Sequence, residues 1–276
     1  MTKLAILLLA LPACMIGSGE NDAPLGFDAW QTKYVSSTTG PTGSQQLFYD
    51  WDQTLTRDQE TKLYAQYVSA KTAGVTQSEA IVNLTIYGVD RWPVGERVQT
   101  YCVSNAFGQF KPAVLQAIAT ATGDWTNAAG GAVGWEYHPE WDGACDTNAP
   151  LTFDAVPIDQ EGGLYAQAFF PSTPREQREL YINLRTVFYN APPVPLEGLL
   201  RHEFGHSLGL RHETARVEGI VEYGLQCYEN VFFRPLTQYD EYSLMATPAC
   251  TGLGGIKNPT LSITDLDAQG IRELYQ

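Results

Sequence analysis

Basic residues are scarce in this sequence, and nowhere do they gather into a cluster. The 276 residues include 17 Lys and Arg against 31 Asp and Glu, which gives a formal net charge of −14. A protein that binds nucleic acid neutralises phosphates with clustered Lys and Arg, so this composition excludes a nucleic-acid partner. Only 17% of the residues are charged and 44% are hydrophobic, which predicts a folded domain with a buried core.

Long apolar runs are also missing beyond the start of the chain. The first residues, MTKLAILLLALPACMIG, place one Lys before an apolar run that is too short to span a bilayer and is typical of a secretory leader. The leader ends in Leu11-Pro12-Ala13-Cys14, which resembles the bacterial lipobox, where the Cys carries a lipid. Two alternatives stay open: a lipid anchor at Cys14 that attaches the protein to a membrane, or secretion after cleavage nearby. Both predict an exported protein.

Cysteine is rare, and none of the five Cys residues has CxxC spacing, so a cysteine zinc site is not expected. With Cys14 set aside, four Cys remain, which in an exported protein suggests two disulfides with three possible pairings. We favour Cys102–Cys145 and Cys227–Cys250, because each bridge then closes a loop within one half of the chain.

The sequence divides into three expected segments: an export signal at 1–14, a linker and pro-segment at 15–84, and a domain at 85–276. The polar stretch SSTTGPTGSQQ is typical of a flexible linker. A short strand, QLFYDW, and a helix that begins with a capping box at Thr56 and Gln59 follow it. One strand and one helix are too little for an independent domain, so we interpret them as a pro-segment or a cover.

The domain shows strand patterns and three helices. Helices are predicted over 111–129, ending at Gly130-Gly131, after Pro193 and Pro195, and over 265–275 behind a Thr264 cap. The strand candidates are ERVQTYCVS, GWEYH, LTFDAVPI, GGLYAQAFF and ELYINLRTVFY. This pattern predicts an α/β (α+β) fold, a mixed layer followed by a loop-rich half.

Histidine is also scarce, and three of the four lie within positions 202–212, HEFGHSLGLRH. Successive helical residues turn by about 100°, so His202 and His206 project from one face and both can reach one metal ion. Glu203 lies beside them, where its carboxylate can hold a water and take a proton from it.

Gly209 matters as much as the ligands. Glycine tolerates the left-handed conformation that ends a helix, so the chain can turn back and deliver His212 as a third imidazole. Three neutral histidines leave a fourth position for water, which is the arrangement of a catalytic zinc site. The motif therefore predicts one catalytic Zn²⁺ on His202, His206 and His212, with Glu203 as general base.

The HExxHxxGxxH pattern resembles that of metzincins, the clan of zinc endopeptidases that includes astacins and matrixins. The clan has a methionine turn beneath the metal, and YDEYSLMATPAC supplies Met245 for it. Glu213 follows the third histidine as in astacins, and the ending LSITDLDAQGIRELY is similar to the closing helix of matrixins. Residues 200–275 also resemble small bacterial astacin-like or matrixin-like secreted peptidases. One departure is Thr247, which stands where astacins have a zinc-binding tyrosine.

The resemblance implies a metzincin-type zincin fold: a twisted mixed sheet, an active-site helix, and a loop-rich C-terminal subdomain ending in a helix. It also implies that Leu164, Tyr165 and Ala166 form an edge strand that pairs with an extended peptide. Tyr239 and Tyr242 are expected to pack in the loops. A pro-segment implies a zymogen, in which Asp50 or Asp52 could cover the zinc as an aspartate does in astacins.

The expected function is endopeptidase hydrolysis of protein or peptide substrates by a monomer, through zinc-activated water. The alternative is an exported zinc-binding lipoprotein whose inactive protease fold acts as a binding module.

Overall fold

The computed structural model describes residues 26–39, 45–49, 53–55, 61, 64, 81–85, 88–161, 164–189, 194–216, 233–247 and 257–276. The predictions for Cys14, the Cys227–Cys250 bridge, Asp50, Asp52 and most of the helix after Thr56 lie outside these residues. Within them, no helix combines the length and the apolar character needed to cross a membrane.

A five-stranded sheet forms the main layer of the domain, in the order β7-β6-β8-β10-β9. Its first four strands are parallel, and β9 pairs antiparallel with β10 at the edge. The strands are β6 (Val98–Val103), β7 (Gly134–Tyr137), β8 (Phe153–Ile158), β9 (Ala166–Gln167) and β10 (Glu179–Asn183). This mixed sheet confirms the predicted fold class.

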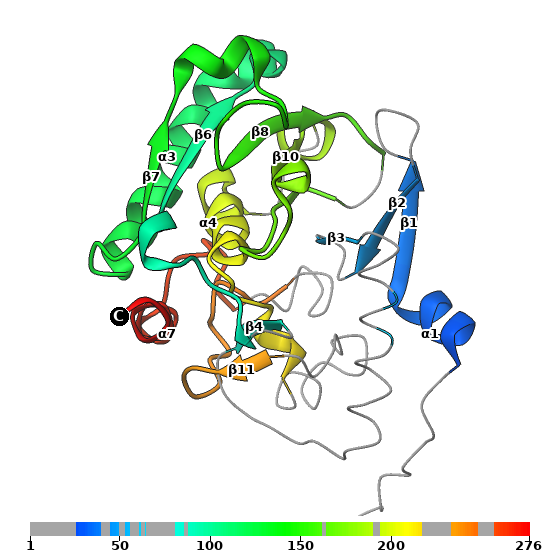
Figure 1. The fold of residues 1–276 in the computed structure, drawn as a ribbon, viewed down its shortest axis with the longest axis vertical. Coiled ribbons are helices and arrows are strands. Elements are labelled where there is room, and N and C mark those ends of the chain that lie inside the picture. Colours follow the sequence, from blue (N-terminus) through cyan, green and yellow to red (C-terminus); the bar gives the residue numbers. More distant parts are fainter. Residues whose placement is uncertain are drawn as a thin grey trace, which may run out of the picture.

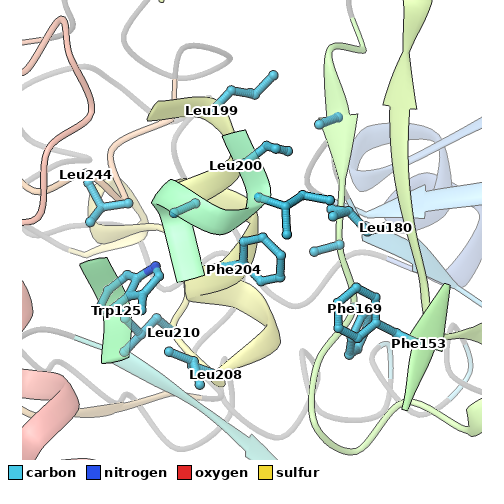
Figure 2. Close-up of a cluster of buried hydrophobic side chains, with 14 of the residues drawn as sticks. Trp125, Phe153, Phe169, Leu180, Leu199, Leu200, Phe204, Leu208, Leu210 and Leu244 are labelled. Carbon is cyan, nitrogen blue, oxygen red and sulfur yellow. The ribbon is translucent and has the colours of Figure 1, made fainter. Parts of the chain in front are cut away.

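Two helices, α3 (Lys111–Ala128) and α4 (Leu196–Ser207), pack against each other and against this sheet. The α3 helix has its predicted extent, and Gly130 and Gly131 end it with φ of 63° and 81°. The indole N–H of Trp125 in α3 donates to the carbonyl of Arg201 in α4 at 2.8 Å. Phe204 of α4 lies in the buried cluster between this indole and the strand side chains, as Figure 2 shows. The core thus fixes one face of α4.

A second, smaller sheet lies on the other side of α4 (Figure 1). It consists of β11 (Phe233–Pro235), β4 (Ile81–Thr85) and β5 (Gly88–Val89), all antiparallel. The expected boundary between pro-segment and domain at 84/85 lies within β4. A third sheet, β1 (Val35–Thr39), β2 (Gln45–Tyr49) and β3 (Gln53–Leu55), follows α1 (Phe27–Tyr34).

The closing helix α7 (Asp265–Tyr275) begins and ends where the sequence predicts. Thr264 caps it, and the side chains of Thr264 and Asp267 complete a capping box. The buried Tyr275 hydroxyl donates to the carbonyl of Leu208 at 2.9 Å, which ties α7 to the end of α4.

Short helical turns connect the main elements. They are η1 (Val94–Glu96), η2 (Asn105–Phe110), η3 (Pro139–Ala144), η4 (Arg175–Gln177), η5 (Arg185–Tyr189, π-helical) and η6 (Glu213–Ala215). The turn η5 corrects the prediction that ELYINLRTVFY is one strand. The strand stops at Asn183 because its side chain accepts from the backbone N–H of Arg185 at 3.2 Å, a local bond that competes with the strand ladder.

The Cys102–Cys145 disulfide is present and joins β6 to the turn after η3, with a Cα–Cα distance of 5.7 Å. It closes a loop with a sequence separation of 43 residues. Cys102 is fully buried, beside Ala149 and Leu151.

Replacing both Cys102 and Cys145 by Ala should lower the free energy of unfolding by about 4 kcal/mol, because the bridge limits the unfolded chain over this loop. Urea unfolding of the variant and the wild type, at equal zinc concentration, measures the difference. An unchanged midpoint, or free thiols at both positions in wild-type protein by alkylation and mass spectrometry, would contradict the bridge.

Candidate metal centre

The end of α4 is a glycine-dependent turn. Gly209 adopts φ of 97°, a conformation that L side chains rarely adopt. The backbone N–H of Gly209 donates to the carbonyl of His206 at 2.8 Å, and that of Leu210 donates to Gly205 at 2.9 Å. These two bonds form a Schellman motif, which stops the helix and reverses the chain toward His212.

Gly209 also lies in close contact with the segment formed by β4 and β5. A Cβ atom at this position would lie 2.1 Å from the carbonyl oxygen of Asp90. The backbone N–H of Asn83 donates to the carbonyl of Gly209 at 2.8 Å, and that of Arg211 to the carbonyl of Ile81 at 3.0 Å. Sequence reasoning missed this contact, because it assigned residues up to 84 to the pro-segment.

The turn brings three buried imidazoles together. One ring nitrogen from each of His202, His206 and His212 lies within 4.8 Å of the others. The ring centroids are 4.8 to 5.1 Å apart, and Nε2 of His202 lies 3.2 Å from Nε2 of His212. Two nitrogens bound to one tetrahedral zinc at Zn–N distances of about 2.0–2.1 Å are themselves about 3.3 Å apart. The three residues therefore fit a single zinc ion.

Backbone carbonyls fix how two of the rings present their nitrogens. Nδ1 of His202 lies 2.7 Å from the carbonyl oxygen of Leu244, and Nδ1 of His206 lies 2.8 Å from that of Leu210. A carbonyl only accepts, so each Nδ1 carries a proton, and in the neutral imidazole Nε2 then holds the lone pair that a metal needs. Both rings are therefore oriented with Nε2 as the metal-binding atom.

Met245 packs beneath the helix that carries the histidines. It is buried, and a Cβ atom at Gly205 would lie 2.4 Å from its sulfur. The carbonyl of Met245 accepts from the backbone N–H of Glu213 at 3.0 Å, directly after the third histidine. Sequence reasoning missed the role of Gly205. A glycine inside a helix costs about 1 kcal/mol relative to alanine, so its presence in HEFGH could have indicated a position where a neighbouring residue leaves no room for a side chain.

Asp267 of α7 holds the segment around Met245 in place. Its carboxylate accepts from the Ser243 hydroxyl at 2.6 Å and from the backbone N–H of Leu244 at 3.1 Å. Leu244 in turn provides the carbonyl that orients His202. Burial raises the pKa of the Asp267 carboxyl despite these bonds. Sequence analysis named Thr264 as the helix cap but not Asp267, although the pattern Thr-x-x-Asp resembles a capping box.

A buried ion pair supports the chain after His212. Glu213 Oε1 accepts from Nη1 of Arg216 at 2.6 Å and from the backbone N–H of Asp240 at 2.9 Å. Burial raises the pKa of Glu213 to about 8, and Arg216 opposes this shift. The Arg216 guanidinium also lies 5.3 Å from the ring centre of Tyr239, which gives this tyrosine a packing contact.

The other predicted site residues lie around this centre. Glu203 is buried on α4, directly after His202, and Thr247 is buried two residues after Met245. Tyr242 is exposed. Ala166 belongs to the edge strand β9, Leu164 and Tyr165 precede it, and β9 lies against α4.

A mixed sheet, a three-histidine centre and a methionine beneath it are together the features of a metzincin-type domain. Stromelysin-3 of Rattus norvegicus is 42% identical over 62 residues, which are 22% of this chain and 13% of that protein. The match confirms the resemblance to metzincins, although it spans only a small part of the relative. The solved structure of myroilysin covers 67% of this chain and 95% of its own, with a TM-score of 0.44 and 17% identity. No family model matches the chain.

Gly209→Ala should destabilise the protein more than the same change at Gly131. Both glycines have positive φ, but in the described part of the chain a Cβ at Gly131 meets no atom within 4 Å. Strain alone should lower the free energy of unfolding by about 1–2 kcal/mol at Gly131. The added clash with Asp90 should at least double this loss at Gly209. Equal losses in urea unfolding would contradict the close contact.

Asp267→Asn should weaken zinc binding by about 10- to 100-fold, because one of the two carboxylate oxygens, both of which accept hydrogen bonds, becomes an NH2 donor. Competition with a chromogenic chelator measures the affinity. Asp265→Asn, an exposed change on the same helix, is the matched control and should bind zinc like the wild type. Equal affinities of the two variants would contradict the role of Asp267.

Proposed function

We propose that this chain is an exported zinc-dependent endopeptidase that hydrolyses peptide bonds. The observation that carries the proposal is the convergence of three buried imidazoles, with Glu203 next to His202 on α4. Three histidine ligands leave one position open, which distinguishes a catalytic zinc site from a structural one.

The reaction assigns distinct roles to the residues of the chain. When bound, zinc would polarise the substrate carbonyl and lower the pKa of a water molecule. Glu203 would accept a proton from this water and pass it to the leaving amine. His202 and His206 keep their orientation through the carbonyls of Leu244 and Leu210. Met245 supports the helix from below and takes no part in proton transfer.

The substrate in this proposal is a protein or peptide bound as an extended chain along β9. The predicted edge residues Leu164, Tyr165 and Ala166 would border this chain, and backbone hydrogen bonds along the edge would depend little on side-chain identity. We further propose a monomer that reaches the cell envelope or the medium, either lipidated at Cys14 or secreted. Thr247 leaves the site without a tyrosine ligand at that position, so Glu203 and the metal carry the chemistry.

Zinc content and peptide cleavage test the proposal together. The wild type, with its pro-segment removed, should bind one zinc per chain and cleave members of a broad peptide library. A chelator should abolish cleavage, and added zinc should restore it. Glu203→Ala should keep the zinc and lose at least about 100-fold in kcat, because general-base catalysis is removed. Glu197→Ala, on the same helix, is the control and should retain activity.

Two outcomes would contradict parts of the proposal. Stoichiometric zinc without cleavage of any peptide would favour the alternative, an exported zinc-binding lipoprotein that acts as a binding module. Full activity in Glu203→Ala would show that another group activates the water.

A further inference from the structure

Asn183 is completely buried at the end of β10 and makes four side-chain hydrogen bonds. Its Nδ2 donates to the carbonyls of Gln160 at 3.0 Å and Leu164 at 2.9 Å. Its Oδ1 accepts from the backbone N–H of Gln160 at 3.3 Å and of Arg185 at 3.2 Å. A side-chain amide has two donors and two acceptor lone pairs, so all of its capacity is used. The partners also fix which way the amide points.

These bonds act on the segment that leads into the edge strand. The backbone N–H of Asn183 donates to the carbonyl of Tyr165 at 2.9 Å. The Thr186 hydroxyl donates to the carbonyl of Leu164 at 2.8 Å, the same oxygen that receives the Asn183 amide. Two consecutive carbonyls are thus attached to the end of β10 and to the turn that follows it.

The register of β9 determines which backbone groups face outward. Ala166 lies opposite Ile182, and Gln167 lies opposite Tyr181. In an antiparallel pair, hydrogen-bonded and non-hydrogen-bonded positions alternate. Because Tyr165 bonds to Asn183, Ala166 directs its N–H and C=O away from β10. Among the described strands of this sheet, β9 is the last on this side, and it lies against α4.

Charged contacts in the same region are weaker candidates for holding this segment. Arg185 pairs with Asp159 at 2.8 Å and with Glu161 at 2.9 Å, but all three side chains are substantially exposed to solvent. Solvent screening makes exposed ion pairs contribute little. The buried amide and hydroxyl, which have no water to replace their partners, therefore determine where the segment lies.

We propose that Asn183, assisted by Thr186, is a positioning residue for substrate. By fixing Leu164 and Tyr165 on β10, it sets the register in which Ala166 offers its N–H and C=O to an extended peptide near the metal centre. The inference rests on the proposed peptidase function and adds to it the residues that determine backbone recognition.

The test measures peptide binding instead of turnover, in zinc-loaded Glu203→Ala protein. A fluorescent peptide that the wild type cleaves is compared by anisotropy with versions carrying one backbone N-methyl group at each position in turn. The Glu203→Ala protein, the parent in this test, should bind the peptide methylated at the residue opposite Ala166 about tenfold more weakly than the unmethylated peptide. This is the effect of about one lost hydrogen bond. Asn183→Asp replaces both donors by acceptors at similar shape, and Thr186→Val removes one donor. Both should weaken binding of the unmethylated peptide and reduce the tenfold difference to about twofold.

Asn148→Asp makes the same chemical change at an exposed position and should behave like the parent. If Asn183→Asp and Thr186→Val lower the melting temperature but keep the tenfold difference, the two residues are only structural and the inference is wrong. If the wild type cleaves no peptide and the parent binds none while zinc is present, the proposed function fails together with the inference. The two failures are therefore distinguishable.

Discussion

The convergence of three imidazole lone pairs inside the protein is the constraint on which the rest of this structure depends. Nε2 of His202 and Nε2 of His212 are only 3.2 Å apart, and all three rings are buried. Two such lone pairs repel each other unless a proton or a metal ion lies between them, so folding of this region and binding of a metal would be coupled. The surrounding structure has to hold the rings against this repulsion, and it does so with backbone carbonyls from both sides of the centre.

Each ring is held by a different part of the chain. His206 is oriented by the turn of its own helix, through the carbonyl of Leu210. His202 is oriented by Leu244, which α7 fixes through Asp267. His212 is delivered by the Gly209 turn and followed by Glu213, whose backbone N–H is bound by Met245. The closing helix α7, whose Asp267 lies more than fifty residues after His212 in the sequence, therefore helps to hold the metal site in place.

Local patterns in the sequence were enough to predict α3, α4, α7, the strands of the main sheet and the fold class, but not α1 or the strands β4, β5 and β11. The Thr264 cap and the Gly130-Gly131 pair act within one turn of the chain, so the extents of α7 and α3 could be predicted from the sequence. Contacts between distant segments could not be predicted from such local patterns. Nothing near residue 82 indicates that it lies beside Leu210, and the glycine in HEFGH does not indicate that Met245 is the residue it makes room for. ELYINLRTVFY is rich in apolar and aromatic residues, yet the strand ends at Asn183, whose side chain bonds to the backbone N–H of Arg185.

Asp267 and Asn183 perform similar tasks for two different segments, and their chemistry explains why one is an acid and the other an amide. The segment beside Met245 presents donors to Asp267: the Ser243 hydroxyl and the N–H of Leu244. A carboxylate only accepts, so it can bind both. The segment before β9 presents both carbonyls and an N–H to Asn183, so only a side chain with donors and acceptors can satisfy it. An Asp at position 183 would leave two carbonyls without a donor, and an Asn at position 267 would turn one of two acceptors into a donor, which is why each position constrains its residue although neither belongs to the histidine motif.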